Sequence, residues 1–314
     1  MRTPLKPRAL RRGDVVGLVS PAGAVWEEDR IDKAVRHLEG RGFRVEVGAH
    51  ARGHHGAFAA DDAGRLEDLN RMFRDPRIRA VFATRGGYGT PRLLEGIDYA
   101  AVRRDPKVVV GYSDMTALQL ALFRRTGLVT FSGPLAAVEF AAGPDPYTGE
   151  RFWELVTSRR RPGRLPLPEG RSLPVLHPGR AEGPLLGGCL AVLTGLLGTR
   201  FLPDFRGAVL VLEDVHETIH RIDRMLTQLR LAGVLGKVSG IALGEFTGAV
   251  AAVPSKPSHS LEETFEAVFR GVEVPRVGGL PYGHVPCKAT MPFGIRARLD
   301  ADRGTLEFLE AAVA

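Results

Sequence analysis

The sequence is poor in cysteine. Only Cys189 and Cys287 occur among 314 residues, and neither belongs to a CxxC pair. Disulfide scaffolds and thiolate zinc sites need more cysteines at short spacing, so the sequence favours neither. We therefore expect a reducing compartment, the cytoplasm.

Long apolar runs are also missing. The longest largely apolar stretch, residues 185–198, is shorter than the roughly 18 to 20 residues of a membrane span. Arg11-Arg12 could pass for a twin-arginine signal, but residues 13–20 are too short and too acidic for the apolar region of a signal and are better interpreted as a strand. We expect a soluble chain with no membrane partner.

Lysine is scarce although the chain is basic. The formal net charge is +7, and only six of the 43 basic residues are lysine, with arginines spread along the chain. The densest internal cluster, at residues 159–164, lies beside prolines and lacks the interleaved aromatic residues that stack on bases. The sequence therefore predicts no nucleic-acid partner.

What the chain does contain is a regular alternation of valine-rich runs and helical patterns in its first 140 residues. The runs lie at residues 15–19, 44–47, 80–83, 107–111 and 129–131, with a helical pattern between each pair. Strands that alternate with helices form βαβ units and a parallel sheet covered on both faces. The pattern predicts an N-terminal doubly wound parallel sheet of the Rossmann or flavodoxin-like α/β class.

The composition shifts after residue 143. Residues 144–182 are rich in proline, glycine, arginine and serine, with a possible short helix at 153–156, which predicts a linker. Residues 183–314 mix helical and strand patterns, which predicts a C-terminal mixed α/β domain. A chain of 314 residues also suits two domains better than one. We expect domains at 1–143 and 183–314.

One serine lies on a sharp turn between a predicted strand and a predicted helix. Residues 107–111 run into Tyr112-Ser113-Asp114, and a helical pattern follows. Such a turn presents a nucleophile in hydrolases, but serine is also an ordinary helix N-cap. The glycine turn at 85–89 follows the preceding strand, where its amides could bind an oxyanion or a phosphate, or form a plain loop. It does not match the dinucleotide-binding fingerprint.

A second motif competes for the function. His216-Glu217-Thr218-Ile219-His220 matches HExxH, which holds zinc when both histidines share a helix face. Here the helical pattern begins near residues 219–221, so His216 is expected outside the helix. A third ligand has no typical spacing, although Glu245 or His259 could be proposed. We expect no metal and no cofactor.

Seven short blocks resemble the LD-carboxypeptidase family of serine peptidases and extend over nearly the whole chain. They are Val19-Ser20-Pro21-Ala22-Gly23, Arg85-Gly86-Gly87-Tyr88-Gly89, Gly111-Tyr112-Ser113-Asp114, Phe131-Ser132-Gly133-Pro134, Leu212-Glu213-Asp214, Arg221-Ile222-Asp223-Arg224-Met225-Leu226 and Gly283-His284. One departure is Cys189, which follows Gly187-Gly188 where many relatives carry asparagine.

The resemblance implies a catalytic triad of Ser113 as nucleophile, Glu213 as the acid at the end of its strand and His284 as base. A serine hydroxyl needs an imidazole to take its proton and a carboxylate to orient that imidazole. The amides of Gly87 and Asp114 would then be the oxyanion donors. The residues alone leave alternatives open: Glu213 could pair with a nearby arginine while Asp214 or Glu217 acts as the acid, and His284 could be a turn histidine.

The implied activity is hydrolysis of the amide between an L-centre and a terminal D-amino acid, as in D-alanine release from murein tetrapeptides during peptidoglycan recycling. An arginine such as Arg85, Arg221 or Arg224 could bind the substrate carboxylate. The resemblance also implies a homodimer. Alternatives are a microcin C immunity-type peptidase acting on a peptidyl-nucleotide, a zinc metallopeptidase, and a non-catalytic protein that binds an anionic ligand.

Overall fold

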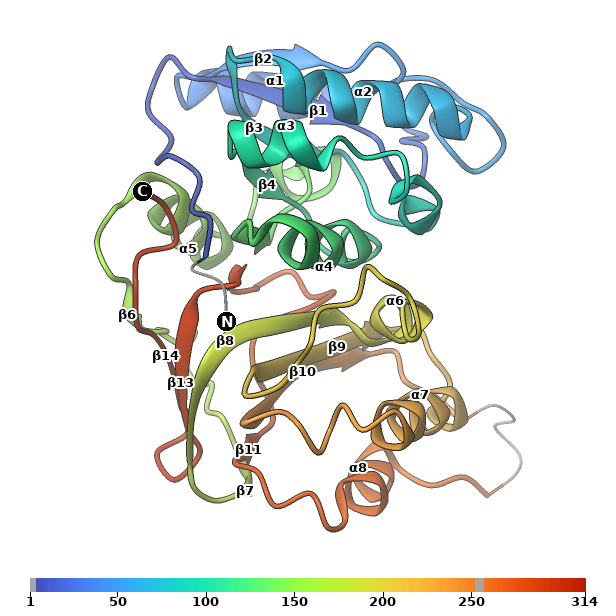
Figure 1. Ribbon diagram of the computed structural model, residues 1–314, viewed down its shortest axis with the longest axis vertical. Helices are drawn as coiled ribbons and strands as arrows, with labels where there is room; N and C mark the ends of the chain where they lie inside the picture. The colour runs from blue at the N-terminus through green and yellow to red at the C-terminus, as the bar shows by residue number, and fades with distance from the viewer. Residues whose placement is uncertain (1–3, 252–256) are drawn as a thin grey trace.

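The computed structural model describes residues 4–251 and 257–314 and contains two sheets stacked along the long axis (Figure 1). Five parallel strands of the first sheet lie in the order 2-1-3-4-5. They are β1 (Val15–Val19), β2 (Arg44–Val47), β3 (Ile78–Ala83), β4 (Val108–Val110) and β5 (Thr130–Ser132). This flavodoxin-like order confirms the predicted doubly wound parallel sheet.

Helices cover both faces of the first sheet because its strands carry apolar side chains on both sides. Phe82 and Val110 point into one hydrophobic cluster, and their neighbours Val81 and Val109 point into the other. The first face is covered by α1 (Arg30–Gly40), η2 (Ala136–Phe140) and α5 (Pro146–Thr157). The second is covered by α2 (Asp62–Arg74), η1 (Thr90–Leu93), α3 (Tyr99–Arg104) and α4 (Met115–Thr126).

The second sheet is mixed, as predicted for the C-terminal part. Its parallel centre consists of β8 (Arg180–Cys189), β9 (Val209–Val215), β10 (Gly240–Thr247) and β11 (Arg276–Val277). Antiparallel strands flank it: β13 (Arg296–Asp300), β14 (Thr305–Phe308) and β6 (Gly163–Arg164) on one side, and β7 (Val175–His177) on the other. The helices of this part are α6 (Leu190–Gly195), α7 (Ile219–Leu231) and α8 (Leu261–Phe269).

Two features of this topology differ from the sequence expectations. Residues 144–182, expected as a linker, contain α5 and the strands β6 and β7, which pair into the second sheet. In addition, β12 (Met291–Phe293) from the C-terminal part pairs antiparallel with β5 and extends the first sheet. The division into domains at 1–143 and 183–314 stays a prediction.

Strand β8 escaped the sequence analysis because its composition argues against a strand. It contains Pro184, Gly187 and Gly188, residue types that are depleted in strand interiors. Gly187 has a φ of +151°, and a Cβ there would lie 1.8 Å from the Val211 carbonyl oxygen. The close approach of β8 to β9 therefore requires glycine at this position.

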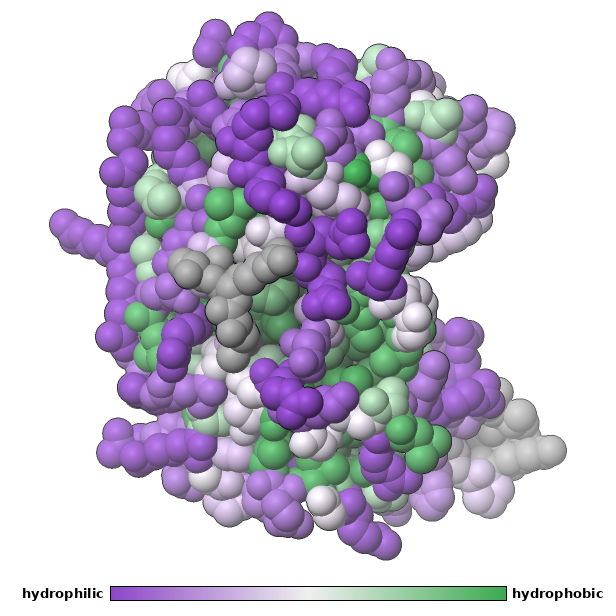
Figure 2. All heavy atoms as spheres, viewed as in Figure 1, coloured by the Kyte–Doolittle hydropathy of each residue, from purple (hydrophilic) through white to green (hydrophobic). Residues whose placement is uncertain are grey.

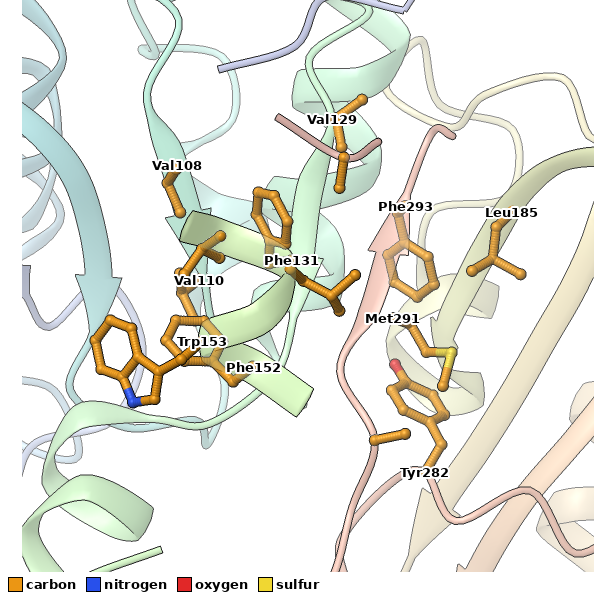
Figure 3. Packing of buried hydrophobic residues seen from close by; sticks show 14 of the residues in the cluster. Val108, Val110, Val129, Phe131, Phe152, Trp153, Leu185, Tyr282, Met291 and Phe293 are labelled. Carbon is orange, nitrogen blue, oxygen red and sulfur yellow. The ribbon is translucent and has the colours of Figure 1, made fainter. Parts of the chain in front are cut away.

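A hydrophobic cluster joins the half of the molecule built on the first sheet, which includes α5, to the half built on the second sheet (Figure 3). Phe131 of β5 and Phe152 of α5 come from the first half, while Tyr282, Met291 and Phe293 lie opposite them. All five are almost completely buried, and full burial of such a side chain is worth about 1.5–3 kcal/mol. This shared core fixes the two halves relative to each other, so residues at their junction have defined positions.

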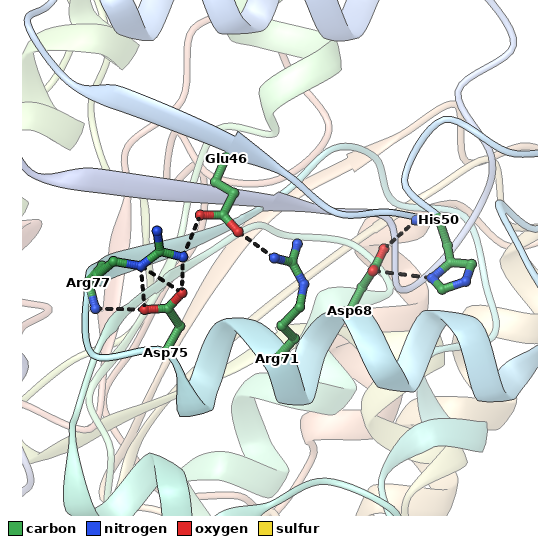
Figure 4. Close-up of polar contacts among 6 residues, drawn as sticks. All are labelled: Glu46, His50, Asp68, Arg71, Asp75 and Arg77. Carbon is green, nitrogen blue, oxygen red and sulfur yellow. Dashed lines mark hydrogen bonds and ion pairs between the residues drawn. The ribbon is translucent and has the colours of Figure 1, made fainter.

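Charged pairs hold α2 against the first sheet (Figure 4). Arg71 of α2 pairs with Glu46 of β2, which also contacts Arg77 at 3.4 Å. Hydrogen bonds from Arg77 lower the pKa of Asp75 to about 2. Asp68 accepts bonds from the His50 backbone N–H at 2.9 Å and from the His50 ring. These contacts anchor the loop that follows β2.

Polar residues cover most of the viewed face, and hydrophobic ones gather toward its middle and lower part (Figure 2). Within residues 4–251 and 257–314, every helix is too short or too polar to cross a membrane.

Candidate active site

Ser113 lies on the turn between β4 and α4 with a left-handed backbone. Its φ is +65°, one of two positive values among the described residues other than glycine, and Gly111 before it has a φ of +151°. A left-handed conformation costs a non-glycine residue about 1–3 kcal/mol and is concentrated at functional sites. Among the described residues, the Ser113 side chain accepts no hydrogen bond from an amide of α4, so it does not act as a side-chain cap. Its partly exposed side chain matches a nucleophile turn.

The glycine turn after β3 packs directly against Ser113. A Cβ at Gly86 would lie 2.8 Å from Ser113 Cβ and 2.9 Å from its Oγ, so only glycine fits. Gly87, with a φ of +116°, is exposed. Among the hydrogen bonds within residues 4–251 and 257–314, none is donated by the Gly87 or Asp114 amide. Neither amide is therefore engaged by another described residue, and their role as oxyanion donors stays a prediction.

The Asp114 side chain ties this turn to the next segment. Its carboxylate accepts a bond of 2.8 Å from the Thr90 N–H, at the start of η1. Burial raises the pKa of this carboxyl group, although the bond from Thr90 opposes that effect. The nucleophile turn and the glycine turn are thus held together at the carboxyl edge of the sheet, where ligands of such folds bind.

Glu213 and His284 form a hydrogen-bonded pair in the second half. The His284 Nδ1 lies 2.7 Å from Glu213 Oε2, and the Glu213 side chain is completely buried. Since a carboxylate only accepts, Nδ1 donates, and in a neutral imidazole Nε2 is then the acceptor. Glu213 was expected at the end of its strand, but β9 continues to Val215. A Cβ at Gly283 would lie 2.7 Å from Glu213 Oε2, so glycine permits the contact.

Tyr112 joins the two parts of the site. It directly precedes Ser113, and its ring centroid lies 4.9 Å from that of His284 at an interplanar angle of 68°. The structure therefore brings the predicted nucleophile turn and the predicted histidine–glutamate pair to one place, where the two halves meet.

The three arginines suggested for the substrate carboxylate lie in different surroundings. Arg85 of the glycine turn is half-buried and donates to the Ala24 carbonyl at 3.0 Å. Arg221 is exposed and pairs with Glu217 at 3.0 Å, and Arg224 is exposed on α7. Their roles stay predictions, with Arg85 in the same turn as Gly87.

The HExxH match does not form a helical zinc site. Helix α7 begins at Ile219, as expected, so His216 lies before it in a loop with a φ of +53°. His216 and His220 are both exposed. Over the part of the chain that the structure describes, no three His, Cys, Asp or Glu side chains are grouped to hold a metal ion.

Cys189 pairs with Glu213 in the sheet register and contacts the next carboxylate. Its thiol donates to Asp214 Oδ1 at 3.6 Å, and its backbone N–H donates to Thr116 Oγ1 at 3.1 Å. Burial raises the pKa of this thiol. Asp214 also accepts from the Ala191 N–H at 2.9 Å, which holds the start of α6.

Asp214 makes the stability depend on pH. Burial raises its pKa from 3.8 to about 6, so between these values the folded state holds a proton that the unfolded chain has lost. The free energy of unfolding therefore falls as pH rises through this window. Relative to Asp214→Asn, we expect the free energy of unfolding of the wild type to fall by about 2–3 kcal/mol between about pH 4 and 7. Urea unfolding across this range measures the difference, and parallel profiles would contradict it.

A groove of about 1050 Å³ lies elsewhere on the molecule. It is lined by the C-terminal end of α4, including Phe123 and Gly127, and by residues of β8 and the loop before β9. Ser113 precedes the opposite end of this 12-residue helix, about 18 Å away at 1.5 Å per residue. The groove is therefore separate from the candidate site.

Sequence reasoning missed the polar residues that support the site. Glu139 and Lys288 form a buried pair at 2.6 Å, and Ser132 bonds to the Tyr282 hydroxyl at 2.6 Å. Ser132 lies in one of the family-like blocks, which was a usable signal. Glu139 and Lys288 belong to no motif, and only the fold brings them together.

Comparison with known proteins agrees with this geometry. The chain matches the model of the LD-carboxypeptidase N-terminal domain over residues 16–133 and that of the C-terminal domain over residues 182–299. It is 37% identical to the probable murein peptide carboxypeptidase of Bacillus subtilis, with 98% of this chain and 95% of that protein covered. It is 36% identical to the murein tetrapeptide carboxypeptidase of Pseudomonas aeruginosa, covering 92% and 94%.

A solved structure is also similar. The wild-type microcin C7 self-immunity protein MccF, known by that name in Escherichia coli, superimposes with a TM-score of 0.91 at 28% identity, covering 99% of this chain and 100% of that one. Two family models together match well over half of the chain, in the order expected. The chain therefore belongs to the LD-carboxypeptidase family of serine-type carboxypeptidases.

Proposed function

We propose that this carboxypeptidase hydrolyses the amide between an L-centre and a terminal D-amino acid, with Ser113, His284 and Glu213 as its triad. The observation that carries the proposal is the 2.7 Å contact between His284 and the buried Glu213, beside a serine held at a φ of +65°. A nucleophile, a base and an orienting carboxylate are what acyl transfer requires.

In the proposed reaction Ser113 Oγ attacks the scissile carbonyl while His284 Nε2 takes its proton. Glu213 keeps the proton on Nδ1 and stabilises the imidazolium that forms. The Gly87 and Asp114 amides stabilise the oxyanion. His284 then protonates the leaving amine, and a water molecule activated by the same imidazole hydrolyses the acyl-enzyme. No step needs a metal or a cofactor.

The proposed substrate is a murein tetrapeptide that loses its terminal D-alanine in peptidoglycan recycling. Two relatives carry murein peptides in their names, which supports this substrate. Arg85, in the same turn as the Gly87 amide, is the arginine best placed by sequence to bind the terminal carboxylate. We extend the proposal to a cytoplasmic homodimer.

The alternative is a peptidase that cleaves a peptidyl-nucleotide, and the similarity to MccF favours it. A nucleobase needs an aromatic platform. Trp153 is 7% exposed and lies in the core, whereas Trp26 is 56% exposed and stacks on His54. Trp26 is therefore available to a base, and so is Tyr88 beside Gly87, which is 59% exposed. We prefer the murein substrate because two relatives are named for murein peptides.

Incubation with paired peptides tests the proposal. We expect release of D-alanine from an L-Ala-γ-D-Glu-meso-diaminopimelyl-D-Ala tetrapeptide, no release from the matched peptide ending in L-alanine, and no effect of a chelator. A peptidyl-sulfamoyl adenosine serves as the competing substrate. Faster cleavage of that compound would favour the alternative, and loss of activity with chelator would contradict the serine mechanism.

A further inference from the structure

A buried ion pair lies beside His284, and the proposed reaction does not use it. Lys288 Nζ is 2.6 Å from Glu139 Oε1, and the two side chains are only 4% and 10% exposed. Lys288 and His284 lie in one loop, residues 281–289, which we call the histidine loop. Glu139 belongs to η2 in the first half. The pair therefore connects the histidine loop to the half that carries Ser113.

The pair also fixes the ring that contacts His284. The Tyr112 hydroxyl donates to Glu139 Oε1 at 2.9 Å, and Lys288 Nζ lies 3.9 Å from the centroid of the Tyr112 ring. Glu139 Oε2 in turn accepts from the Leu135 N–H at 2.8 Å. Tyr112 is thus held at its hydroxyl and over its ring while it packs against His284 at 4.9 Å.

Other contacts close the histidine loop and bind it to the first half. The Ala289 N–H donates to the Pro281 carbonyl at 2.6 Å, which joins the two ends of the loop. Tyr282, whose hydroxyl points toward the first half in Figure 3, bonds to Ser132 at 2.6 Å. Thr148 Oγ1 accepts from the Lys288 N–H at 2.8 Å. Every one of these partners outside the loop belongs to the first half, which includes α5.

Stability alone does not account for a buried ion pair at this place. Removing two charges from water costs about as much as their attraction returns, and apolar residues of similar volume often stabilise a fold equally well. An apolar pair makes no directional hydrogen bond, so it could not hold the Tyr112 hydroxyl at a fixed point. A fixed Tyr112 ring matters here because it packs against His284, and proton transfer requires the imidazole within hydrogen-bond reach of the serine.

We propose that Lys288 is a positioning residue for His284, acting through Glu139 and Tyr112. The proposal rests on the function proposed above. It adds that a buried ion pair between the two halves fixes the position of the imidazole relative to Ser113. Lys288 and Glu139 touch neither substrate nor the reacting atoms. They hold Tyr112, and Tyr112 limits how the His284 ring can rotate while Glu213 holds its Nδ1.

Two variants test this proposal. Glu139→Gln combined with Lys288→Met removes both charges without leaving one unpaired, and Tyr112→Phe removes only the hydroxyl. Tyr99→Phe is the matched control, because the Tyr99 hydroxyl also donates one bond, of 2.8 Å, in this case to the Leu94 carbonyl at the end of η1, outside the site. Melting temperature and circular dichroism establish that each variant is folded.

The first readout is the proton resonance of His284 Nδ1–H, assigned by its absence in His284→Gln, and the second is the split between kcat and KM. We expect the resonance to shift or broaden in both variants, and kcat to fall about tenfold in the double variant and about threefold in Tyr112→Phe, with KM unchanged. Tyr99→Phe keeps both at wild-type values.

An unchanged resonance and kcat in both variants, even with a lower melting temperature, would overturn the proposal, because the pair would then only hold the halves together. The resonance does not depend on turnover. If the wild type fails to cleave the tetrapeptide, the proposed function falls, and the resonance still decides whether Lys288 positions His284.

Discussion

Replacing Ser113 by alanine lowers kcat for the L,D-tetrapeptide by on the order of 10⁴-fold or more, with substrate binding retained. The reason is that the variant has no oxygen to form the acyl-enzyme, while the glycine turn and the histidine–glutamate pair stay in place. Residual turnover would come from the oxyanion donors and from substrate positioning alone.

Release of D-alanine under single-turnover conditions measures this loss, and a fluorophosphonate probe that labels the wild type but not Ser113→Ala identifies the nucleophile. Ser239→Ala is the matched control, since Ser239 is partly exposed like Ser113 but lies before β10, where it donates to the Ala208 carbonyl at 3.1 Å. Activity that survives in Ser113→Ala and disappears with chelator would contradict the serine mechanism and favour His216 and His220.

The first half of the fold was predictable because its signals are local. Each strand there overlaps a short run that contains valine, and each crossover contains one α-helix, so periodicity alone gives a parallel sheet. The Ser113 turn was visible for the same reason: β4, the turn and α4 follow each other within 20 residues. What the sequence left open was whether Ser113 caps the helix, and among the described residues its side chain accepts no bond from an amide of α4.

The remaining features depend on contacts between distant segments. Strand β12 is three residues long and becomes a strand only because β5 offers an unpaired edge, about 160 residues earlier in the chain. The glycines of β8 argue against a strand locally, yet they let β9 approach closely. Glu139 and Lys288 meet at 2.6 Å although they are 149 positions apart in sequence, so no spacing rule could pair them.

The same reasoning explains why the acid needs its own test. On spacing alone, Glu213, Asp214 and Glu217 were equivalent candidates. The structure places Glu213 Oε2 at 2.7 Å from His284, whereas Asp214 accepts backbone bonds from Ala191 and Val215, and Glu217 pairs with Arg221. Alternation along β9 directs neighbouring side chains to opposite faces, so only one of Glu213 and Asp214 can face the histidine.

Glu213→Gln separates these candidates and is expected to lower kcat about 10³- to 10⁴-fold with little change in KM. The glutamine keeps the shape of the carboxylate, but its amide nitrogen donates. With that nitrogen toward Nδ1, the imidazole proton moves to Nε2 and His284 can no longer accept from Ser113. In the other orientation, the imidazolium loses the negative charge that stabilises it.

Steady-state kinetics of three variants check this expectation. Glu245→Gln is the matched control, because Glu245 lies on the neighbouring strand β10 and pairs with Arg171 at 2.8 Å. Asp214→Asn is expected to retain activity while changing only the pH dependence of stability. If Asp214→Asn instead loses activity and Glu213→Gln keeps more than about a tenth of it, Asp214 is the acid and the His284–Glu213 contact serves the fold, because a catalytic carboxylate cannot become an amide without a loss of this size.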